Sequence, residues 1–476
     1  MVLYGYITAF SYGIICLLAA ALLYKLGMPK IYTRKFVHIL VGFEWVILYI
    51  FHGATYHFLI VCLAFLALLA VVAAKGLMPM ISSDSDNALG TVYYAVSMSI
   101  MATICLISPK FMIPFGIAVF CTSFGDGFAA IVGQAVKKHN PAVYKNKSLF
   151  GTLANFILCV LAIIALKHIF ALEISYIYIC LIALFAVELE LFTGKGLDNI
   201  TLPLGTFILT AFVMFYPYAS EYILPIILTL PVVAFVDAKK LLSSFGIVVA
   251  FALDVIVSIS LGNFGFILLL LFLALGALSD GVKKRASYAD FNPKREVRTQ
   301  AQVMANALVA AVCAVSFKTT ESVIFAVAFA ASLAEALADT LSSSFGSLSK
   351  KTFDIFKMKK CQKGLSGGMS LIGTLSALVG AAFMGGVCIL FGYKSFRFFL
   401  SVTVAAFAGT VFDSFLGSVF QAKYKCRACG KITESEEHCN MPTDKYSGLT
   451  CISNNTVNLL STAFSATLAA LMYYLI

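Results

Sequence analysis

The sequence has little charge: 12% of its 476 residues are charged, whereas 61% are hydrophobic. This composition excludes an ordinary soluble protein. A Gly-x-x-x-x-Gly-Lys-Ser/Thr loop is absent, which disfavours a Walker-type ATPase. The apolar runs are continuous and lack the alternation of membrane β-barrel strands. The first run lacks a basic start and a small-residue cleavage site, so we expect a retained helix rather than a signal peptide.

What the sequence does contain is a series of apolar runs of about 20 residues, the length needed to cross about 30 Å of hydrocarbon. They predict an all-α, polytopic integral membrane protein with about 16 transmembrane helices in two related halves. The halves are residues 1–217 and 218–476, and the second contains a Cys/His loop at 421–452. The expected helices are 3–24, 36–52, 55–74, 88–108, 111–135, 150–170, 173–193, 199–217, 219–236, 242–261, 263–279, 299–316, 320–346, 367–391, 396–420 and 453–476.

Positive charge is distributed unevenly over the loops of this scheme. With the N-terminus outside, the inside loops hold 29 of the 34 lysine and arginine residues, as the positive-inside rule requires. The net charge of +11 therefore needs no nucleic-acid partner, although it suits anionic substrates. We expect a multi-pass protein of a prokaryotic plasma membrane, with its active-site loops cytoplasmic. The outside keeps Lys110, Lys167, Lys318, Lys394 and Arg397.

Asp126, between two glycines, lies near the inner end of expected helix 111–135. An aspartate deep in a membrane helix costs about 2.5–3.5 kcal/mol on insertion scales, which favours a catalytic or metal–phosphate role. The alternative is a structural acid neutralised by Lys137 or Lys138.

The loop after Asp126 is basic and ends in Lys147-Ser148-x-x-Gly151-Thr152 at the start of a helix. Free N–H groups at a helix start, with lysines such as Lys145 and Lys147 nearby, bind phosphate. We therefore expect Ser148, Gly151 and Thr152 to contact a nucleotide.

A second group of residues completes the expected first site. Arg34 and His38 are four residues apart on one helix face beside Lys35, and they suit phosphate; positive-inside anchoring is the alternative. Glu190, Asp198 and Asn199 offer carboxylate and amide oxygens, which suit Mg²⁺ and its nucleotide. For Asp198 and Asn199 the alternative is that they cap the eighth helix.

The second half repeats this pattern. Glu335 and Asp339 are four residues apart on one helix face and would repel unless a cation or lysines intervene. A basic, glycine-rich segment follows and again enters a helix, which indicates polyphosphate binding. In both halves a glycine stands seven residues after the aspartate, Gly133 and Gly346. The segment contains Gly368, Ser370, Gly373 and Thr374, and Asp413 ends a later helix as a further magnesium ligand.

Two other polar groups belong to this half. Arg298, Gln302 and Asn306 form a stripe that faces either a site or a neighbouring helix by hydrogen bonding. Asn454 and Asn455 begin the last helix much as Asp198-Asn199 begins the eighth.

The Cys/His loop has the spacing of metal ligands. Cys426-x-x-Cys429 followed by His438-Cys439 is consistent with structural zinc. A cluster of reduced thiols is the alternative, and a disulfide is disfavoured on a cytosolic face.

The motifs of the first half resemble the phytol kinase and dolichol kinase family, which are CTP-using kinases of polyisoprenoid alcohols and more distantly similar to phosphatidate cytidylyltransferases. The sequence departs from that family at Phe150, where relatives often carry an acid. The resemblance rests on Arg34-Lys35-x-x-His38, Gly125-Asp126, Lys147-Ser148-x-x-Gly151-Thr152 and the stretch from Glu190 through Asp198-Asn199 to Pro203.

The second half resembles the membrane family that includes plant phytyl-phosphate kinase. The sequence departs from that family at Ser344, where relatives often have glutamate. The resemblance rests on Ala334-Glu335-x-x-x-Asp339-Thr340, Gly367-Gly368-x-Ser370-x-x-Gly373-Thr374, Asp413-Ser414-x-x-Gly417 and Asn454-Asn455.

Together the two resemblances imply consecutive reactions: an isoprenoid alcohol would be phosphorylated by the first half and its monophosphate by the second. They imply CTP or UTP as donor, Mg²⁺, and catalytic roles for Asp126, Lys147, Asp339 and Glu335. Two alternatives remain: a cytidylyltransferase that forms a CDP-lipid, and a secondary transporter, because two similar halves with buried acids also suit transport.

Overall fold

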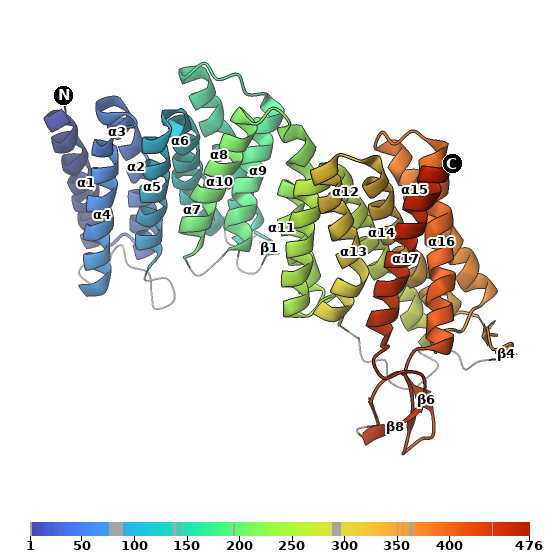
Figure 1. Cartoon of the computed structure of the whole chain (residues 1–476). Helices are drawn as coiled ribbons and strands as arrows, with labels where there is room; N and C mark the ends of the chain where they lie inside the picture. Colours follow the sequence, from blue (N-terminus) through green and yellow to red (C-terminus); the bar gives the residue numbers. More distant parts are fainter. Residues whose placement is uncertain are drawn as a thin grey trace. The chain divides into compact units, whose positions relative to one another are not determined.

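A computed structural model describes most of the chain, which divides into two compact units, unit 1 (Met1–Ser220) and unit 2 (Glu221–Ile476) (Figure 1). Residues 217 and 218, the expected boundary between the two halves, form a turn just before this division. Lys137, Lys138 and Lys145 lie outside the described residues. Those are 2–75, 89–136, 140–144, 147–193, 196–287, 297–349, 351–354, 356–360, 365–439 and 441–476.

Unit 1 consists of helices with one short antiparallel strand pair, β1 (Ala142–Tyr144) and β2 (Lys147–Ser148). A 3₁₀ turn, η1 (Pro109–Phe111), and a π-helical segment, η2 (Cys121–Asp126), lie on either side of α6. The α-helices are α1 (Val2–Lys25), α2 (Lys30–Val41), α3 (Glu44–His52), α4 (Tyr56–Lys75), α5 (Gly90–Ile107), α6 (Met112–Phe120), α7 (Gly127–Ala135), α8 (Leu149–Ile169), α9 (Tyr176–Phe192) and α10 (Asp198–Phe215).

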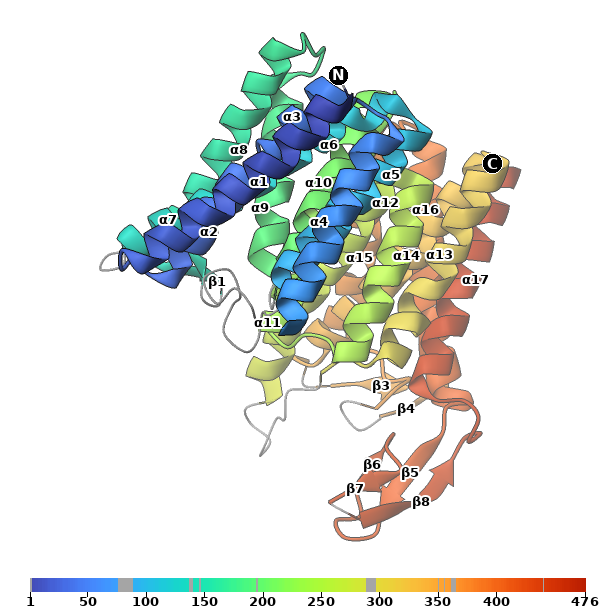
Figure 2. The same ribbon diagram turned by 90° about the vertical axis from the view of Figure 1, so that its left-hand side faces the viewer.

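Unit 2 is also helical, and the 3₁₀ helix η4 (Ala219–Tyr222) spans the division between the units. A strand pair and a four-stranded antiparallel sheet of order β6-β5-β8-β7 lie at one end of its helices (Figure 2). The helices are α11 (Ile223–Ala238), α12 (Ser244–Ser287), α13 (Gln300–Thr320), α14 (Val323–Gly346), α15 (Leu371–Leu390), α16 (Phe396–Val419) and α17 (Asn454–Leu475); the strands are β3 (Phe353–Asp354), β4 (Lys359–Lys360), β5 (Lys423–Cys426), β6 (Ile432–Thr433), β7 (Glu437–His438) and β8 (Met441–Ser447).

The all-α membrane class is confirmed, and the helix count agrees approximately with the expected one. Within the described residues, 14 helices are long and apolar enough to cross a membrane, against about 16 expected from run length. The expected helices 242–261 and 263–279 are both present within the element α12 and are separated at Gly262, whose backbone is not helical (φ 57°, ψ −141°). The expected helix 173–193 is α9, which has 17 residues and is not among the 14.

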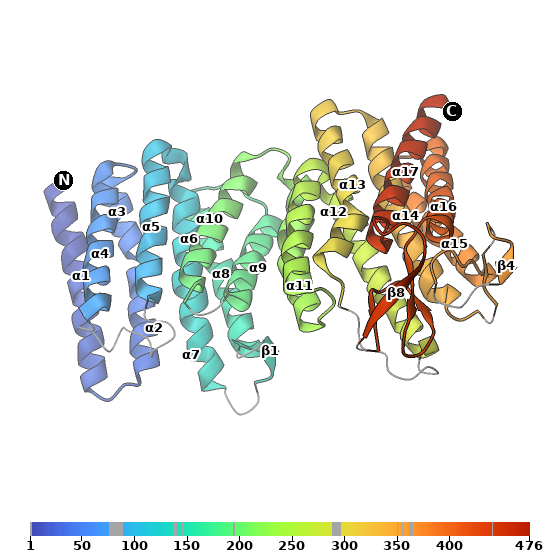
Figure 3. The same cartoon turned by 60° about the horizontal axis from the view of Figure 1, so that its bottom comes forward.

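Each unit is built around one buried helix. In the most apolar stretch of Pro109–Ala135 and of Val323–Gly346, 72% of the residues are buried, against at most 44% in any other of the 14 spans. α14 contacts α12, α13, α15, α16 and α17 (Figure 3). These two most enclosed helices carry Asp126 and Asp339, which places both acids away from lipid.

The glycine seven residues after each acid allows two helices to approach closely. A Cβ on Gly151 would lie 2.7 Å from the carbonyl oxygen of Ala129, and its Cα lies beside Gly133. A Cβ on Gly373 would lie 2.9 Å from the carbonyl oxygen of Ser342, beside Gly346 in the same way. Both units therefore bring the start of the following helix against the acid-bearing helix, where only glycine leaves room.

Candidate functional site

The acid of unit 1 is held by a buried lysine. Asp126 ends the π-helical segment η2 and is 7% exposed, and Lys35 of α2 is 8% exposed. Lys35 Nζ donates a hydrogen bond to Asp126 Oδ2 over 2.6 Å. His38 Nε2 lies 3.5 Å from the same oxygen and 3.2 Å from the carbonyl oxygen of Thr122. Irregular π segments recur at functional sites. The carboxylate of Asp126, the last residue of this segment, lies next to two basic side chains.

A second ion pair extends this cluster. Lys147, just before α8, donates to Glu190 Oε1 near the end of α9. Burial opposes its charge, but the carboxylates of Glu190 and Asp126, with a smaller contribution from Asp198, raise the pKa of Lys147 above its usual value. The lysine is therefore a cation at neutral pH. The basic and acidic residues that the sequence predicted from separate segments thus meet in one place.

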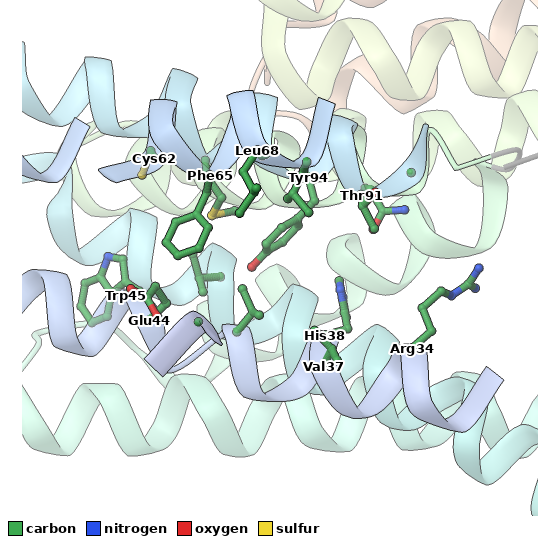
Figure 4. A pocket seen from close by; sticks show the side chains of 18 of the residues that line it. Arg34, Val37, His38, Glu44, Trp45, Cys62, Phe65, Leu68, Thr91 and Tyr94 are labelled. Carbon is green, nitrogen blue, oxygen red and sulfur yellow. The ribbon is translucent and has the colours of Figure 1, made fainter. Parts of the chain in front are cut away.

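The charged cluster stands at one end of a cavity of about 210 Å³. Arg34 and His38 lie at this end, and Glu44 and Trp45 lie at the other, with Phe65 and Tyr94 between them (Figure 4). The wall between the two ends is mainly apolar. Lys35, Asp126, Asp198 and Asn199 also line the polar end, and Leu17, Val41, Leu48, Phe58, Leu68 and Phe115 are among the apolar lining residues.

Glu44 and Trp45 were not predicted as site residues. Glu44 is 8% exposed, and within the part of the chain that the structure describes neither its Oε1 atom nor the indole nitrogen of Trp45 has a hydrogen-bond partner. An acid inside the apolar run 36–52 is costly in a membrane, so Glu44 could have been found by the reasoning that identified Asp126. Trp45 carried no such signal, because an aromatic side chain in an apolar run is unexceptional.

The remaining predicted residues of unit 1 surround this cluster. Ser148 is the N-cap residue of α8, without a side-chain capping bond, and Thr152 Oγ1 donates to its carbonyl oxygen over 2.9 Å. Asp198 is the first residue of α10 and does not cap it, because Leu197 is the N-cap. Its Oδ1 accepts instead from the backbone and side-chain nitrogens of Asn199, at 3.2 and 3.3 Å. The capping alternative is therefore wrong for these two residues.

Phe150 is 40% exposed and its N–H donates to Asn140.

The acids of unit 2 gather around the buried carboxyl group of Glu335. Glu335 is 1% exposed, and its Oε1 has no hydrogen-bond partner among the described residues. The charges of Asp339 and Asp413 both act on the Glu335 carboxyl group. Ser461 Oγ of α17 donates to Asp413 Oδ2 over 3.4 Å. Three carboxyl groups from α14 and α16 therefore face one region beside α17.

The glycine-rich segment leads to the start of α15 near this region. Ser370 is the N-cap of α15 and its side chain accepts from Gly373 N over 3.2 Å. Thr374 N donates to the Ser370 carbonyl oxygen over 2.8 Å. Gly368 lies in the preceding turn, where Met369 exchanges two backbone hydrogen bonds with Phe353. The predicted helix start is confirmed at this position.

The polar stripe of α13 lines a smaller cavity of about 120 Å³ in unit 2. Arg298, Gln302 and Asn306 lie on its wall, which is otherwise mainly apolar. Gln302 Oε1 accepts from Thr299 N over 2.9 Å in a capping box, and Asn306 Oδ1 accepts from Asn458 Nδ2 over 3.0 Å. The helix-to-helix hydrogen bond of the alternative interpretation is thus present, alongside the cavity.

The sequence of unit 2 also singled out Asn454, Asn455 and Ser344. Asn454 and Asn455 are the first residues of α17, whose N-cap is Ser453. Ser344, the departure from the family pattern, is buried and donates to Ser279 Oγ over 3.2 Å.

The Cys/His residues form the one compact set of metal-ligand atoms among the described residues. The ligand atoms of Cys426, Cys429, His438 and Cys439 all lie within 4.8 Å of one another. The carboxylates of either unit do not form such a set. Mg²⁺ does not require one, because it commonly takes one or two carboxylates and completes its shell with waters and substrate phosphates. The partnerless oxygen of Glu335 fits that demand, whereas Asp126 and Glu190 each already accept from a lysine.

Comparisons with known proteins agree with this architecture. The integral membrane protein family DUF92 matches residues 227–466, slightly more than half of the chain. Phytol kinase of Synechocystis sp. (strain ATCC 27184 / PCC 6803 / Kazusa) is 30% identical over 199 residues, 40% of this chain and 82% of that protein. An uncharacterized membrane protein of the same organism is 29% identical over 215 residues, 44% of this chain and 83% of that protein. No solved structure matches significantly. The chain therefore belongs to the DUF92 family of integral membrane proteins and to a phytol kinase-like membrane family.

Proposed function

We propose that the chain is a membrane-embedded isoprenoid alcohol kinase, in which unit 1 forms the monophosphate and unit 2 phosphorylates it to the diphosphate. The observation that carries the proposal is the cavity of unit 1, with Arg34 and His38 at one end and an apolar wall towards Trp45. A long apolar alcohol needs this combination: its chain occupies the apolar part while its hydroxyl reaches the charges. The similarity to phytol kinase supports the same substrate class.

In the first step the alcohol oxygen attacks the γ-phosphorus of CTP or UTP, the bond to the β-phosphate oxygen breaks, and the nucleoside diphosphate leaves. The hydroxyl proton passes to Asp126, which His38 approaches to 3.5 Å. Lys35, Lys147 and Arg34 offset the phosphate charge, since phosphoryl transfer depends mainly on positioning and electrostatics. Ser148, Gly151, Thr152 and Asn199 would contact the nucleotide phosphates.

In unit 2, Asp339 would act as base or metal ligand, and Glu335 and Asp413 would hold Mg²⁺. When bound, Mg²⁺ would supply positive charge to the bridging phosphate oxygens. Glu190 and Asp198 would take this role in unit 1. The start of α15 and the two asparagines that begin α17 would receive nucleotide phosphates, and the α13 stripe would receive the monophosphate. Arranging both units in one chain keeps a poorly soluble intermediate near its next site.

We propose that the charged ends of both units face the cytoplasmic side of a prokaryotic plasma membrane, where nucleotide is present; the positive-inside pattern supports this orientation. This orientation is part of the proposal, and cysteine labelling of loop positions from either side of the membrane tests it.

The direct test uses the full chain purified in detergent, with γ-labelled CTP and geranylgeraniol or phytol. The expected products are labelled lipid monophosphate and diphosphate with release of CDP. Pyrophosphate with CMP attached to lipid would instead identify a cytidylyltransferase. No transfer to any isoprenoid alcohol or monophosphate would overturn the proposal, and substrate counterflow without nucleotide would identify a transporter.

A further inference from the structure

The Cys/His cluster of unit 2 has no part in the proposed chemistry, yet its geometry is that of a binding site. Its ligands come from two turns. Cys426 ends β5 and Cys429 lies in the turn that leads to β6, whereas His438 ends β7 and Cys439 follows it directly. Because β5 pairs with β8, with Cys426 opposite Thr443, the sheet brings the two turns together.

The distances within the cluster suit a tetrahedral ion. His438 Nδ1 lies 3.5 Å from Cys429 Sγ and 3.2 Å from Cys439 Sγ. Zinc bonds of about 2.3 Å to sulfur and about 2.0 Å to nitrogen place tetrahedral ligands about 3.5–3.8 Å apart. Small side-chain adjustments would therefore close the site.

The backbone of both turns is shaped for this convergence. Gly430 has φ 70° and its N–H donates to the Cys426 carbonyl oxygen over 3.0 Å. Cys439 has φ 55°, a conformation that costs a residue with a side chain and persists where surrounding structure demands it.

The described residues of the sheet offer little apolar surface to hold it together. β6 and β7 have two residues each, and the buried residues of the four strands are Lys423, Tyr424 and Cys426. A sheet of this size has too little apolar surface to fold by burial alone, and small modules of this kind use metals or disulfides.

We propose that the segment 421–452, here called the ribbon, binds a structural Zn²⁺ through Cys426, Cys429, His438 and Cys439, and that this ion positions the turn 365–369 before α15. Two contacts join the ribbon to that turn. Glu434, next to β6, accepts a hydrogen bond from Ser366 N over 2.6 Å, and Lys423 Nζ of β5 donates to the Ser366 carbonyl oxygen over 2.9 Å.

The turn is closely packed on its other side as well. Gly367 has φ 88°, and a Cβ there would lie 2.5 Å from the backbone nitrogen of Ser418 at the end of α16. A displaced ribbon would therefore release Ser366 and loosen the packing of the turn against the end of α16. This link rests on the proposed function only in giving the start of α15 a phosphate-binding role.

Metal content tests the site without reference to activity. We expect the full chain, purified in detergent without added metal, to contain one zinc per chain by elemental analysis. Cys429→Ser should lose it, and Cys451→Ser is the matched control, because Cys451 is exposed in the same segment but outside the cluster. Replacement by Co²⁺ should give the visible spectrum of a tetrahedral thiolate centre. Absence of zinc from the wild type, its retention in Cys429→Ser, or a disulfide among these cysteines would overturn the site.

Hydrogen exchange tests the link to the turn. Chelation should accelerate exchange of the Ser366 amide by about tenfold or more, the factor expected for loss of one charge-assisted hydrogen bond. Glu434→Ala should do the same while keeping the zinc, and Glu437→Ala, an exposed glutamate of the same sheet, should not. Unchanged exchange in both the chelated protein and Glu434→Ala would contradict the link. Both readouts remain valid if the kinase assay fails.

Discussion

The buried glutamates of the two units differ in their surroundings. Glu190 of unit 1, like Asp126, faces a lysine, whereas Glu335 of unit 2 faces Asp339 and Asp413 and keeps one oxygen without a hydrogen-bond partner among the described residues. Buried carboxylates that face one another repel unless a cation joins them. We therefore propose that unit 1 is organised before its substrates arrive, and that the Glu335 region of unit 2 depends more strongly on a bound divalent ion.

The largest expected effect concerns the buried lysine of unit 1. Lys35→Met should destabilise unit 1 by about 3–5 kcal/mol, because it leaves the Asp126 carboxylate buried without its partner. The double variant with Asp126→Asn should recover part of this loss. Denaturation of the detergent-solubilised protein measures both. Arg427→Met is the control, since Arg427 and its partner Asp444 are exposed and exposed pairs contribute little. Equal losses of stability from the two substitutions would mean that burial does not set the Lys35–Asp126 pair apart.

The dependence on Mg²⁺ should differ between the two steps. Glu335→Gln should raise the Mg²⁺ concentration for half-maximal monophosphate phosphorylation by about 10–100-fold, as loss of a group around a metal does. The first step should keep its Mg²⁺ dependence in this variant. A magnesium titration of each step with its own substrate makes the comparison, and an equal shift in both would contradict separate sites.

The close helix approach is the feature that the units share. Gly373→Ala should destabilise unit 2 by about 1–3 kcal/mol, the usual cost of overpacking, because the new Cβ would lie 2.9 Å from a carbonyl oxygen. Gly386→Ala in the same helix is the matched control, since nothing lies within 4 Å of its Cβ position. Thermal unfolding of both variants tests this. If Gly373→Ala is no less stable than the control, the approach is not constrained as described.

The smallest effect concerns the two cavities, of about 210 and 120 Å³. Trp45→Phe should enlarge the apolar end of the first cavity and shift the first step towards longer alcohols by about threefold to tenfold, in line with the modest selectivity of apolar pockets. Competition between alcohols of two lengths measures the ratio. The preference of the second step should stay unchanged, and a shift there instead would assign the chain-binding role to the wrong unit.

Most of the fold could be predicted because membrane helices are specified by run length and by charge at their ends. Asp126 and Asp339 were identifiable because an acid in an apolar helix is costly. The paired glycines were visible as a repeated spacing, although their close contact needed the structure. The expected number of about 16 helices exceeds the 14 long spans because α12 contains two of the expected helices, on either side of Gly262, and because α9 has only 17 residues.

The contacts of the site could not be predicted to the same degree. Lys35 and Asp126 are 91 residues apart, and no local pattern records their pairing. Gln302 was correctly placed on the polar stripe, but whether it caps its own helix depends on where α13 begins. The ribbon illustrates the same limit: the spacing of its cysteines was readable, whereas the sheet that gathers them depends on strands as short as two residues.

The most direct test of two separate catalytic units is a product analysis of Asp126→Asn and Asp339→Asn with labelled CTP. The account predicts that Asp339→Asn converts geranylgeraniol to the monophosphate, which accumulates. Asp126→Asn should leave the alcohol unchanged but still phosphorylate added monophosphate. Diphosphate formation at the wild-type rate by Asp339→Asn, or loss of monophosphate phosphorylation in Asp126→Asn, would contradict the division of labour between the units.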